Sequence, residues 1–361
     1  MKPRFSPLLV SRPTVTLMLL AGLAAAAFAF SGRALASERP PSGHSAAAAD
    51  LTGAALPLGT VTVLGSTSCP TGAASGAKCK QITVSCPGLP DLNATLGVAI
   101  PTAPLIGTII LHAGGPGTIF YDAGFADVYL GDGFNVVQIA WANDWSNADG
   151  AGVKSAACRP ATVFDYAFRV VQHSSRAIGF CGQGISGGGG ALGYALTHYG
   201  LSDEFDYVVI ASGPGVSRMD YGCDPPLYTG PHLNLCPLLT DAPYAYAAGD
   251  DSKVNTWEGT TTCGASKPLK ADVSRWTADS IVSAGANYNY PQTAVSWFFC
   301  VTNPGQDTGQ GDFLIQQVVP RNDPADVNCY SGGCTGEGVW QDPNAFNLAV
   351  SEMLSQCQAN H

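Results

Sequence analysis

Charge is scarce in this sequence, and the little that is present is mostly acidic. Only 12% of the 361 residues are charged and 46% are hydrophobic, which excludes an intrinsically disordered chain and favours one well-buried globular domain. Four of the 17 Lys and Arg lie in the first 36 residues, so 13 remain against 27 Asp and Glu, a formal charge of −14 beyond residue 36. Such an acidic surface repels nucleic acid and anionic lipid, so we expect neither as a partner.

Long hydrophobic runs are missing everywhere except at the N-terminus. There, three basic residues precede an uncharged apolar run over residues 13–30, and a small-residue Ala-Leu-Ala pattern ends at residue 36. This layout is typical of a secretory signal peptide, although the run approaches the length of a membrane anchor. We predict a signal peptide over residues 1–36 and a flexible Ala- and Ser-rich spacer over residues 37–55. The mature chain is then expected to be secreted or periplasmic, without a membrane span.

Metal-binding patterns are also missing. The sequence has no CxxC pair, and its six histidines are scattered, so we predict neither a metal site nor a cofactor. All 12 cysteines follow the predicted cleavage point, and an even number of cysteines in an exported protein indicates disulfides. Proximity in the sequence favours the pairs Cys223–Cys236 and Cys329–Cys334.

From residue 106 onward, short apolar segments alternate with segments of helical character. This alternation predicts an α/β fold, in which helices cover both faces of a mostly parallel sheet. We expect strands over residues 60–64, 80–86, 94–100, 106–112, 135–140, 177–181, 207–211, 295–301 and 326–330, and helices over residues 162–173, 190–198 and 343–357.

The alternation stops over residues 214–291, where Pro, Tyr, Cys and Trp are dense. This segment is too long for a connecting loop, so we interpret it as a cap inserted into a domain that spans residues 56–361. Its aromatic side chains are candidates for the wall of an apolar substrate pocket, although such residues also pack the core of a cap. They are Tyr221, Tyr228, Tyr244, Tyr246, Trp257, Trp276, Tyr288 and Tyr290.

The strongest chemical motif is Gly184-Ile185-Ser186-Gly187-Gly188. An apolar strand is expected before it and a helix after it, which is the setting of a nucleophile elbow that presents a reactive serine on a tight turn. Glycines suit this turn because the strand and the helix approach each other closely there. A glycine-rich linker is the alternative interpretation of the motif, but it does not account for the flanking elements.

A serine nucleophile also requires donors for the oxyanion that forms during acyl transfer. The elbow supplies the backbone N–H of Gly187. The second donor is expected in the turn His112-Ala113-Gly114-Gly115-Pro116-Gly117, from Gly114 or Gly115, because glycine lets backbone amides point into a site. An ordinary Gly-Pro turn is the alternative.

Together these features resemble an α/β-hydrolase with a cap between its sixth and seventh core strands. The Gly-Gly-Pro-Gly turn is similar to the oxyanion turn of the proline iminopeptidase and secreted tripeptidyl aminopeptidase families, and the similarity covers about residues 106–357. The resemblance implies an acid after the strand that ends near residue 301, where Asp307 matches it and Asp312 is the alternative. It also implies a histidine after the strand that ends near residue 330.

At the histidine's place the sequence departs from these families. The segment over residues 336–343 resembles their Gly-His stretch before the last helix, but Glu337 occupies the position of the histidine. Three explanations stay open: Glu337 is the base, a cap histidine such as His232 supplies it, or the site is inactive. A glutamate stays ionised at a pH where histidine is protonated and useless as a base, and the sedolisin peptidases use that logic on another fold.

The sequence thus predicts a secreted serine hydrolase whose catalytic residues are Ser186, Asp307 and Glu337. It is expected to cleave a carboxylic ester, or less readily an amide, through an acyl-enzyme, with a small molecule, a polyester or a peptide as substrate. Two alternatives remain, a serine aminopeptidase and a catalytically inactive binding protein on a hydrolase scaffold.

Overall fold

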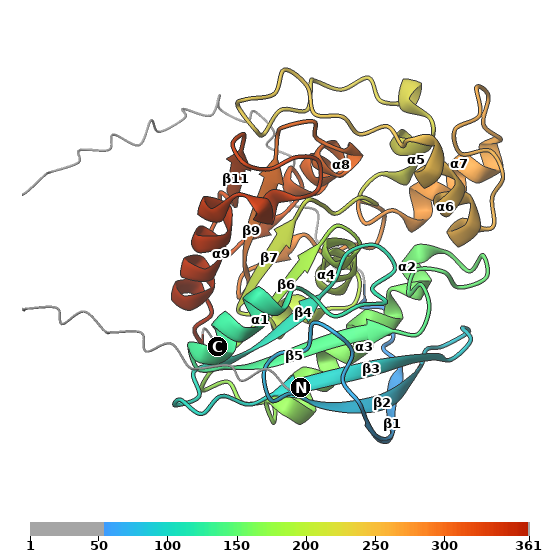
Figure 1. Cartoon of the computed structure of the whole chain (residues 1–361). Coiled ribbons are helices and arrows are strands. Elements are labelled where there is room, and N and C mark those ends of the chain that lie inside the picture. Colours follow the sequence, from blue (N-terminus) through green and yellow to red (C-terminus); the bar gives the residue numbers. More distant parts are fainter. Residues whose placement is uncertain (1–53, 360–361) are drawn as a thin grey trace, which may run out of the picture. The chain divides into compact units, whose positions relative to one another are not determined.

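Nine strands form one central sheet, and their spatial order differs from their order in the chain (Figure 1). The computed structural model describes residues 54–359. From one edge to the other, the strands are β1 (Thr60–Thr67), β2 (Lys78–Ser85), β3 (Leu92–Ala99), β5 (Phe134–Trp141), β4 (Gly107–His112), β6 (Gly179–Ile185), β7 (Tyr207–Ala211), β9 (Ala294–Cys300) and β11 (Asp326–Tyr330). A separate pair, β8 (Asn289–Tyr290) and β10 (Val319–Pro320), is parallel.

The sheet is antiparallel at one edge and parallel over the rest. β1, β2, β3 and β5 pair antiparallel in turn, whereas every pairing from β5 across to β11 is parallel. The central strands β4, β5 and β7 are almost entirely buried, which explains why they are continuous apolar runs in the sequence. The predicted α/β-hydrolase fold is confirmed.

Helices cover both faces of this sheet. Side chains alternate between the faces along β4: Ile110 belongs to the core beneath α3 and α4, and Ile109 belongs to the core beneath α1 and α9. The helices are α1 (Ala123–Gly131), α2 (Val153–Ala156), α3 (Cys158–Tyr166), α4 (Gly187–Thr197), α5 (Met219–Cys223), α6 (Ala248–Glu258), α7 (Lys270–Asp279), α8 (Gln306–Ile315) and α9 (Pro343–Gln356). The chain continues from α3 as a π-helical turn, so the helix predicted over residues 162–173 begins earlier and changes type.

The N-terminal predictions lie mostly outside the described residues. This holds for the signal peptide over residues 1–36 and for the spacer apart from its last two residues. Across residues 54–359, no helix is both long enough and apolar enough to cross a membrane.

All 12 cysteines are paired, and both pairs predicted from sequence proximity are wrong. The six bonds are Cys69–Cys79, Cys86–Cys158, Cys181–Cys357, Cys223–Cys263, Cys236–Cys329 and Cys300–Cys334. Successive residues of a strand face opposite sides of the sheet. Cys300 of β9 lies opposite Tyr330, the residue after Cys329, so Cys300 and Cys329 face opposite sides of the sheet. Cys329 bonds to Cys236 of the cap, whereas Cys300 bonds to Cys334 on the other side.

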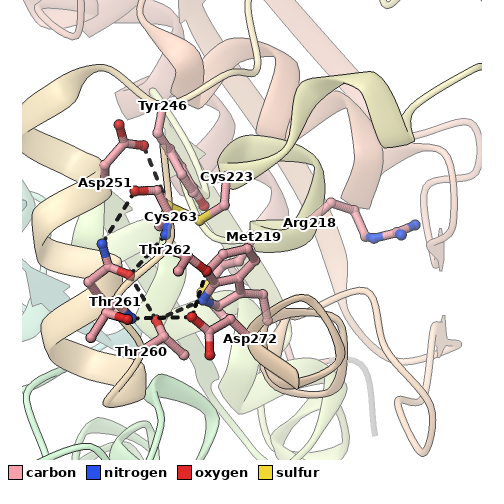
Figure 2. Close-up of a disulfide and its surroundings, with 12 residues drawn as sticks. Arg218, Met219, Cys223, Tyr246, Asp251, Thr260, Thr261, Thr262, Cys263 and Asp272 are labelled. Carbon is pink, nitrogen blue, oxygen red and sulfur yellow. Dashed lines mark hydrogen bonds between the residues drawn. A yellow bond between two sulfur atoms is a disulfide. The ribbon is translucent and has the colours of Figure 1, made fainter. Parts of the chain in front are cut away.

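One disulfide organises the cap between β7 and β9. Figure 2 shows the bond between Cys223, at the end of α5, and Cys263, in the turn after α6. The Thr262 hydroxyl beside it donates a 2.6 Å hydrogen bond to Asp272 of α7. The three cap helices are thus fixed to one another, and the Cys236–Cys329 bond fixes the cap to the sheet.

A buried carboxyl pair joins the cap to the core. Glu258, at the end of α6, is 2% exposed and accepts a 2.8 Å hydrogen bond from the backbone N–H of Val153 on α2. Burial, followed by the neighbouring Asp279 carboxyl, raises the pKa of Glu258 to about 8, although Arg275 lies 3.2 Å away and opposes the shift. Folding therefore favours the protonated form of this side chain.

We expect Glu258 to make stability depend on pH in one direction. A glutamate ionises near pH 4.3 in the unfolded chain and only near its raised pKa in the fold, so its contribution is full below about pH 4.3 and is lost as the pH rises towards 8. The loss is on the order of 5 kcal/mol, because each unit of pKa difference corresponds to about 1.4 kcal/mol. Melting temperatures of Glu258→Gln minus wild type should therefore increase from pH 4 to pH 8. The exposed Asp91→Asn substitution is the control, and a difference for Glu258→Gln that stays flat would contradict the shift.

Candidate functional site

Ser186 sits at the turn between β6 and α4 in a conformation that side chains rarely adopt. Its backbone has φ 50° and ψ −115°, a strained combination for a residue other than glycine. The surrounding structure holds it there, because its N–H donates to Ala211 of β7 and its carbonyl accepts from Gly190 of α4. This is the geometry that the sequence predicts for a nucleophile elbow.

The glycines beside Ser186 are required by close backbone contacts. A Cβ atom at Gly184 would lie 2.5 Å from the backbone of Gly188, and one at Gly188 would lie 2.1 Å from the carbonyl oxygen of His112. A Cβ at Gly187 would lie 2.3 Å from the carbonyl oxygen of Gly115. The first turn of α4 therefore packs directly against the end of β4 and the turn that follows it.

A pair of glycine substitutions in α4 tests this packing. Gly188→Ala places its Cβ within 2.1 Å of backbone, so we expect a loss of about 3 kcal/mol and a melting temperature lower by roughly 6–10 °C. Gly190→Ala meets only Val216 at 3.5 Å and gains helix propensity of about 1 kcal/mol, so it should melt at or slightly above the wild-type temperature. Equal melting temperatures for the two variants would show that the elbow is looser than described.

The two candidates for the second oxyanion donor, Gly114 and Gly115, are not equally placed. Gly187 and Gly115 line the pocket that contains Ser186, whereas Gly114 does not, because it packs against the backbone of Ile185. Gly187 is the first residue of α4, so its N–H has no partner within the helix. Within residues 54–359, the Gly115 N–H also donates to no other backbone group. Of the two alternatives left by the sequence, the geometry favours Gly115.

His112 holds the turn that contains Gly114 and Gly115, and it is not available as a base. The indole N–H of Trp141 donates to its Nε2 at 3.0 Å, so Nδ1 carries the proton and donates to the Ala113 carbonyl at 2.8 Å. Burial lowers the pKa of His112 to about 4, so the ring stays neutral. Gly117 is held against the rings of His112 and Trp141, because its carbonyl accepts from the backbone N–H of Trp141 at 2.9 Å.

One pocket of about 460 Å³ brings together the three residues predicted to be catalytic. Ser186, Asp307 and Glu337 all line it, although they follow three different strands, β6, β9 and β11. Asp307 is 5% exposed and lies in the first turn of α8, whereas Glu337 is exposed on the loop before α9. The alternative acid Asp312 is buried elsewhere, with its carboxylate next to the N–H of Leu235.

Asp307 lies where its neutral form is favoured. Burial, followed by the interaction with the Glu337 carboxyl, raises the pKa of Asp307 well above its usual range. Asp250 adds to this effect, whereas Lys253, which forms a 2.8 Å ion pair with Asp250, opposes it. Because two adjacent carboxylates cannot both ionise cheaply, this position favours the protonated form of Asp307.

A hydrogen bond from the end of β7 fixes the backbone at Glu337. The hydroxyl of Ser212 donates to the Glu337 carbonyl at 2.9 Å, and Ser212 is 3% exposed. In the described part of the chain, the Ser186 hydroxyl makes no hydrogen bond to the Glu337 carboxyl, so these groups face the same pocket without direct contact. Catalytic hydrogen bonds of this kind often form only when substrate is bound.

No histidine among residues 54–359 lines this pocket. His198 is buried at the end of α4, and its ring bonds to the Ile281 carbonyl at 2.9 Å. His232, the cap histidine considered as a base, is exposed and lies 3.2 Å from Asp241, outside the pocket. His173 is exposed on the loop before β6, and the other two histidines lie outside the described residues.

The pocket also contains residues that the sequence did not single out. Asp144 and Trp145, on the loop after β5, form one wall, and α6 of the cap contributes a stripe of side chains at helical spacing. Of the eight cap aromatics proposed for the pocket wall, Tyr246 and Trp257 line it. Trp276 and Tyr290 are instead buried in the core.

Comparison with known proteins finds similarity in structure only. No protein-family model matches the chain, and no curated protein matches its sequence. A puromycin-hydrolysing peptidase of Mycobacterium tuberculosis has 12% identity and a TM-score of 0.49, over 78% of this chain and 39% of that one, so this chain spans about two fifths of its length. Acetyl xylan esterase 1 of Thermoanaerobacterium has 12% identity and a TM-score of 0.47, over 82% and 88% of the two chains. A brefeldin A esterase has 14% identity and a TM-score of 0.46, over 81% and 80%.

Proposed function

We propose that this chain is a secreted serine hydrolase that cleaves a carboxylic ester, or less readily an amide, through an acyl-enzyme on Ser186. One observation carries the proposal. A strained turn presents Ser186 to a pocket that also contains two glycine amides and a pair of carboxyl groups, of which Asp307 favours its protonated form. Strain of this kind persists where the surrounding structure enforces it, and it concentrates at functional sites.

Each step of the reaction has a group in this pocket. The Ser186 Oγ attacks the carbonyl carbon of the substrate, and its proton passes to the Glu337 carboxylate. The negative charge moves to the carbonyl oxygen, where the N–H groups of Gly115 and Gly187 are placed to receive it. When the tetrahedral intermediate collapses, the bond to the leaving group breaks and that group takes the proton from Glu337.

The second half of the reaction uses the same groups. Water attacks the acyl-enzyme and gives its proton to Glu337, and the oxyanion again forms between the two glycine amides. Collapse releases the carboxylic acid and returns the proton to Ser186 Oγ. Protonated Asp307 donates to the resting Glu337 carboxylate and orients it. A buried aspartate in a Ser-His-Asp site also orients its base, but it does so as an anion that accepts from the histidine and stabilises the protonated ring.

The six disulfides agree with a secreted or periplasmic location. Disulfides form and persist in oxidising compartments outside the cytoplasm. The predicted signal peptide leads to the same proposal. An exported enzyme with a carboxylate base is suited to acidic surroundings, because a glutamate of ordinary pKa, about 4.3, still accepts a proton where histidine is protonated.

Labelling with a fluorophosphonate probe tests the proposed function. The labelling reports whether Ser186 is reactive, and hydrolysis of p-nitrophenyl esters reports whether the reaction turns over. Both are measured between about pH 3 and 8, the range in which glutamate and histidine side chains ionise. We expect stoichiometric labelling of Ser186 and hydrolysis that persists in acid. No labelling at any pH would favour the inactive binding protein. Faster cleavage of aminoacyl anilides than of esters would favour the serine aminopeptidase.

The substitution Asp307→Asn separates this mechanism from that of a Ser-His-Asp triad. An amide retains the donor of protonated Asp307, so we expect kcat at acidic pH to fall by less than about tenfold, whereas the same change in a Ser-His-Asp triad costs about 10⁴-fold. Because the variant cannot ionise, its activity should also extend to higher pH than that of the wild type, where ionised Asp307 would repel Glu337. A loss near 10⁴-fold in acid would show that Asp307 acts as an anion.

A further inference from the structure

The pocket has two chemically different ends, and one helix of the cap spans both. α6 presents Asp250, Lys253, Val254 and Trp257 to the pocket, a spacing that places them on one helix face. Seven residues separate Asp250 from Trp257, which corresponds to about 10 Å along the axis. The pocket therefore extends about that far beneath α6.

The first end of the pocket contains the groups that surround the proposed base. Asp250 accepts a 2.8 Å hydrogen bond from the side chain of Gln306, the neighbour of Asp307, and Lys253 pairs with Asp250. Glu337 lies near the same lysine, since its charge favours the protonated lysine. The proposed base takes the proton of Ser186 and gives it to the leaving group, so a leaving group departs towards this end.

The second end holds an oriented carboxylate between two indole rings. Asp144 accepts hydrogen bonds from the backbone N–H of Ser146 at 3.0 Å, from the Ser146 hydroxyl at 2.5 Å and from the indole N–H of Trp257 at 3.0 Å. Trp145 and Trp257 both line the pocket beside it. In residues 54–359, Asp144 forms no ion pair with Lys or Arg.

Arg159 and Asp144 attract each other electrostatically, but no ion pair joins them among the described residues. The Arg159 guanidinium lies beneath this loop and donates to the carbonyl groups of Trp145, Asn147 and Pro90. The hydrogen bonds to Asp144 fix its direction, but they leave a formal negative charge in a pocket wall. Indole faces beside a carboxylate favour a cationic nitrogen over a neutral group of the same shape.

The second end also adjoins the oxyanion turn. The N–H of Trp145 donates to the carbonyl of Pro116 at 3.3 Å, and Pro116 follows Gly115 in the pocket wall. In the sheet, β5 and β4 lie on one side of β6, and β9 and β11 lie on the other, so a group bound beside Trp145 and Trp257 is on the side of Ser186 away from Glu337. In an ester or amide substrate, that side receives the acyl group.

We infer that Asp144, Trp145 and Trp257 form a subsite for an ammonium group, so that the preferred substrate carries a cationic nitrogen in its acyl part. The subsite is built from the core loop after β5 and from cap helix α6, and it closes only when the cap is in place. Its location on the acyl side rests on the proposed function, whereas its preference for a cation does not. The acidic surface of the chain would also attract such substrates.

Binding of choline and of 3,3-dimethylbutanol to the full chain tests the preference for a cation directly. The two alcohols have the same shape and differ in a quaternary nitrogen against a quaternary carbon, and calorimetry or tryptophan fluorescence reports binding without catalysis. We expect choline to bind about tenfold more tightly. Asp144→Asn should remove that difference, whereas Asp149→Asn, an exposed residue of the same loop with the same loss of charge, should retain it. Equal binding of the two alcohols to the wild type would overturn the inference.

A matched pair of p-nitrophenyl esters tests the acyl side. For 4-(trimethylammonio)butyrate against 5,5-dimethylhexanoate, we expect kcat/KM about tenfold higher for the cationic ester, and the ratio should collapse in Asp144→Asn but not in Asp149→Asn. If the neutral ester is cleaved equally well or faster, the acyl-side ammonium subsite is wrong while the hydrolase stands. If neither ester is cleaved, the proposed hydrolase is wrong, and the choline comparison alone decides the cation site.

Discussion

Replacing Ser186 by alanine should lower kcat for ester hydrolysis by about 10⁴- to 10⁶-fold, with little change in KM. The substitution removes the only atom proposed to bond to the substrate, and it leaves the oxyanion amides and the pocket walls in place. Residual activity comes from those groups alone, so it should be small but measurable above the uncatalysed rate. The variant should also resist labelling by a fluorophosphonate probe.

The fold should survive this change. Alanine at φ 50° is no more strained than serine, and the bonds that hold the turn come from the backbone of residue 186. Its melting temperature should therefore equal that of the wild type, which separates loss of chemistry from loss of structure. Ser252→Ala, an exposed serine of α6, is the matched control and should retain full activity. Retention of labelling in Ser186→Ala would place the nucleophile elsewhere.

The sheet could be predicted from the sequence because its parallel strands are buried on both faces. β7 and β11 lie over the residues that the apolar pattern predicts, and the other core strands shift by one to four residues at their ends. The central strands are continuous apolar runs and need no tertiary information to be located, whereas the edge strand β11 is only half-buried. The turn at Ser186 is equally local, because the strand, the glycines and the helix are contiguous.

The helix that carries Asp307 could not be predicted in the same way. α8 contains Gly309 and Gly311, which disfavour a helix by roughly 1 kcal/mol each. Packing requires them: a Cβ at Gly311 would lie 2.6 Å from the ring of Phe299 on β9, and one at Gly309 would lie 2.4 Å from the Pro243 carbonyl of the cap. Tertiary contacts therefore override propensity here, and sequence periodicity does not report them.

The contact between Asp144 and Trp257 in the pocket wall also could not be predicted from the sequence. They are 113 positions apart, and their hydrogen bond exists only because the cap folds over the loop after β5. The disulfide pairs misassigned by proximity have the same cause, since Cys236 and Cys329 meet across 93 positions. Sequence order predicts a catalytic serine and its acid, whereas the pocket wall that selects a substrate depends on long-range packing.

Glu337 is the position at which the chemistry of this pocket departs most from a Ser-His-Asp site. Glu337→Gln removes the proton acceptor and keeps the shape of the side chain, so kcat/KM should fall by about 10³- to 10⁴-fold at every pH. The acidic but remote Asp132→Asn, at the end of α1, should leave it unchanged. If Glu337→Gln keeps activity that is confined to neutral pH, then a histidine, with His232 the first to replace, supplies the base.

Glu337→His should restore activity with a different pH dependence, and this is the sharper test. A base must be deprotonated, and in model peptides an imidazole gains its proton about two pH units above a carboxylate, so activity with histidine at residue 337 should be lost at a higher pH than in the wild type. The acid limb of the profile should thus move up by about two pH units. Protonated Asp307 beside an imidazolium should ionise, because an opposite charge favours the anion, and the pair then resembles a Ser-His-Asp arrangement. An acid limb that stays where the wild type has it would show that the titrating base is not the side chain at residue 337, even if Ser186 is the nucleophile.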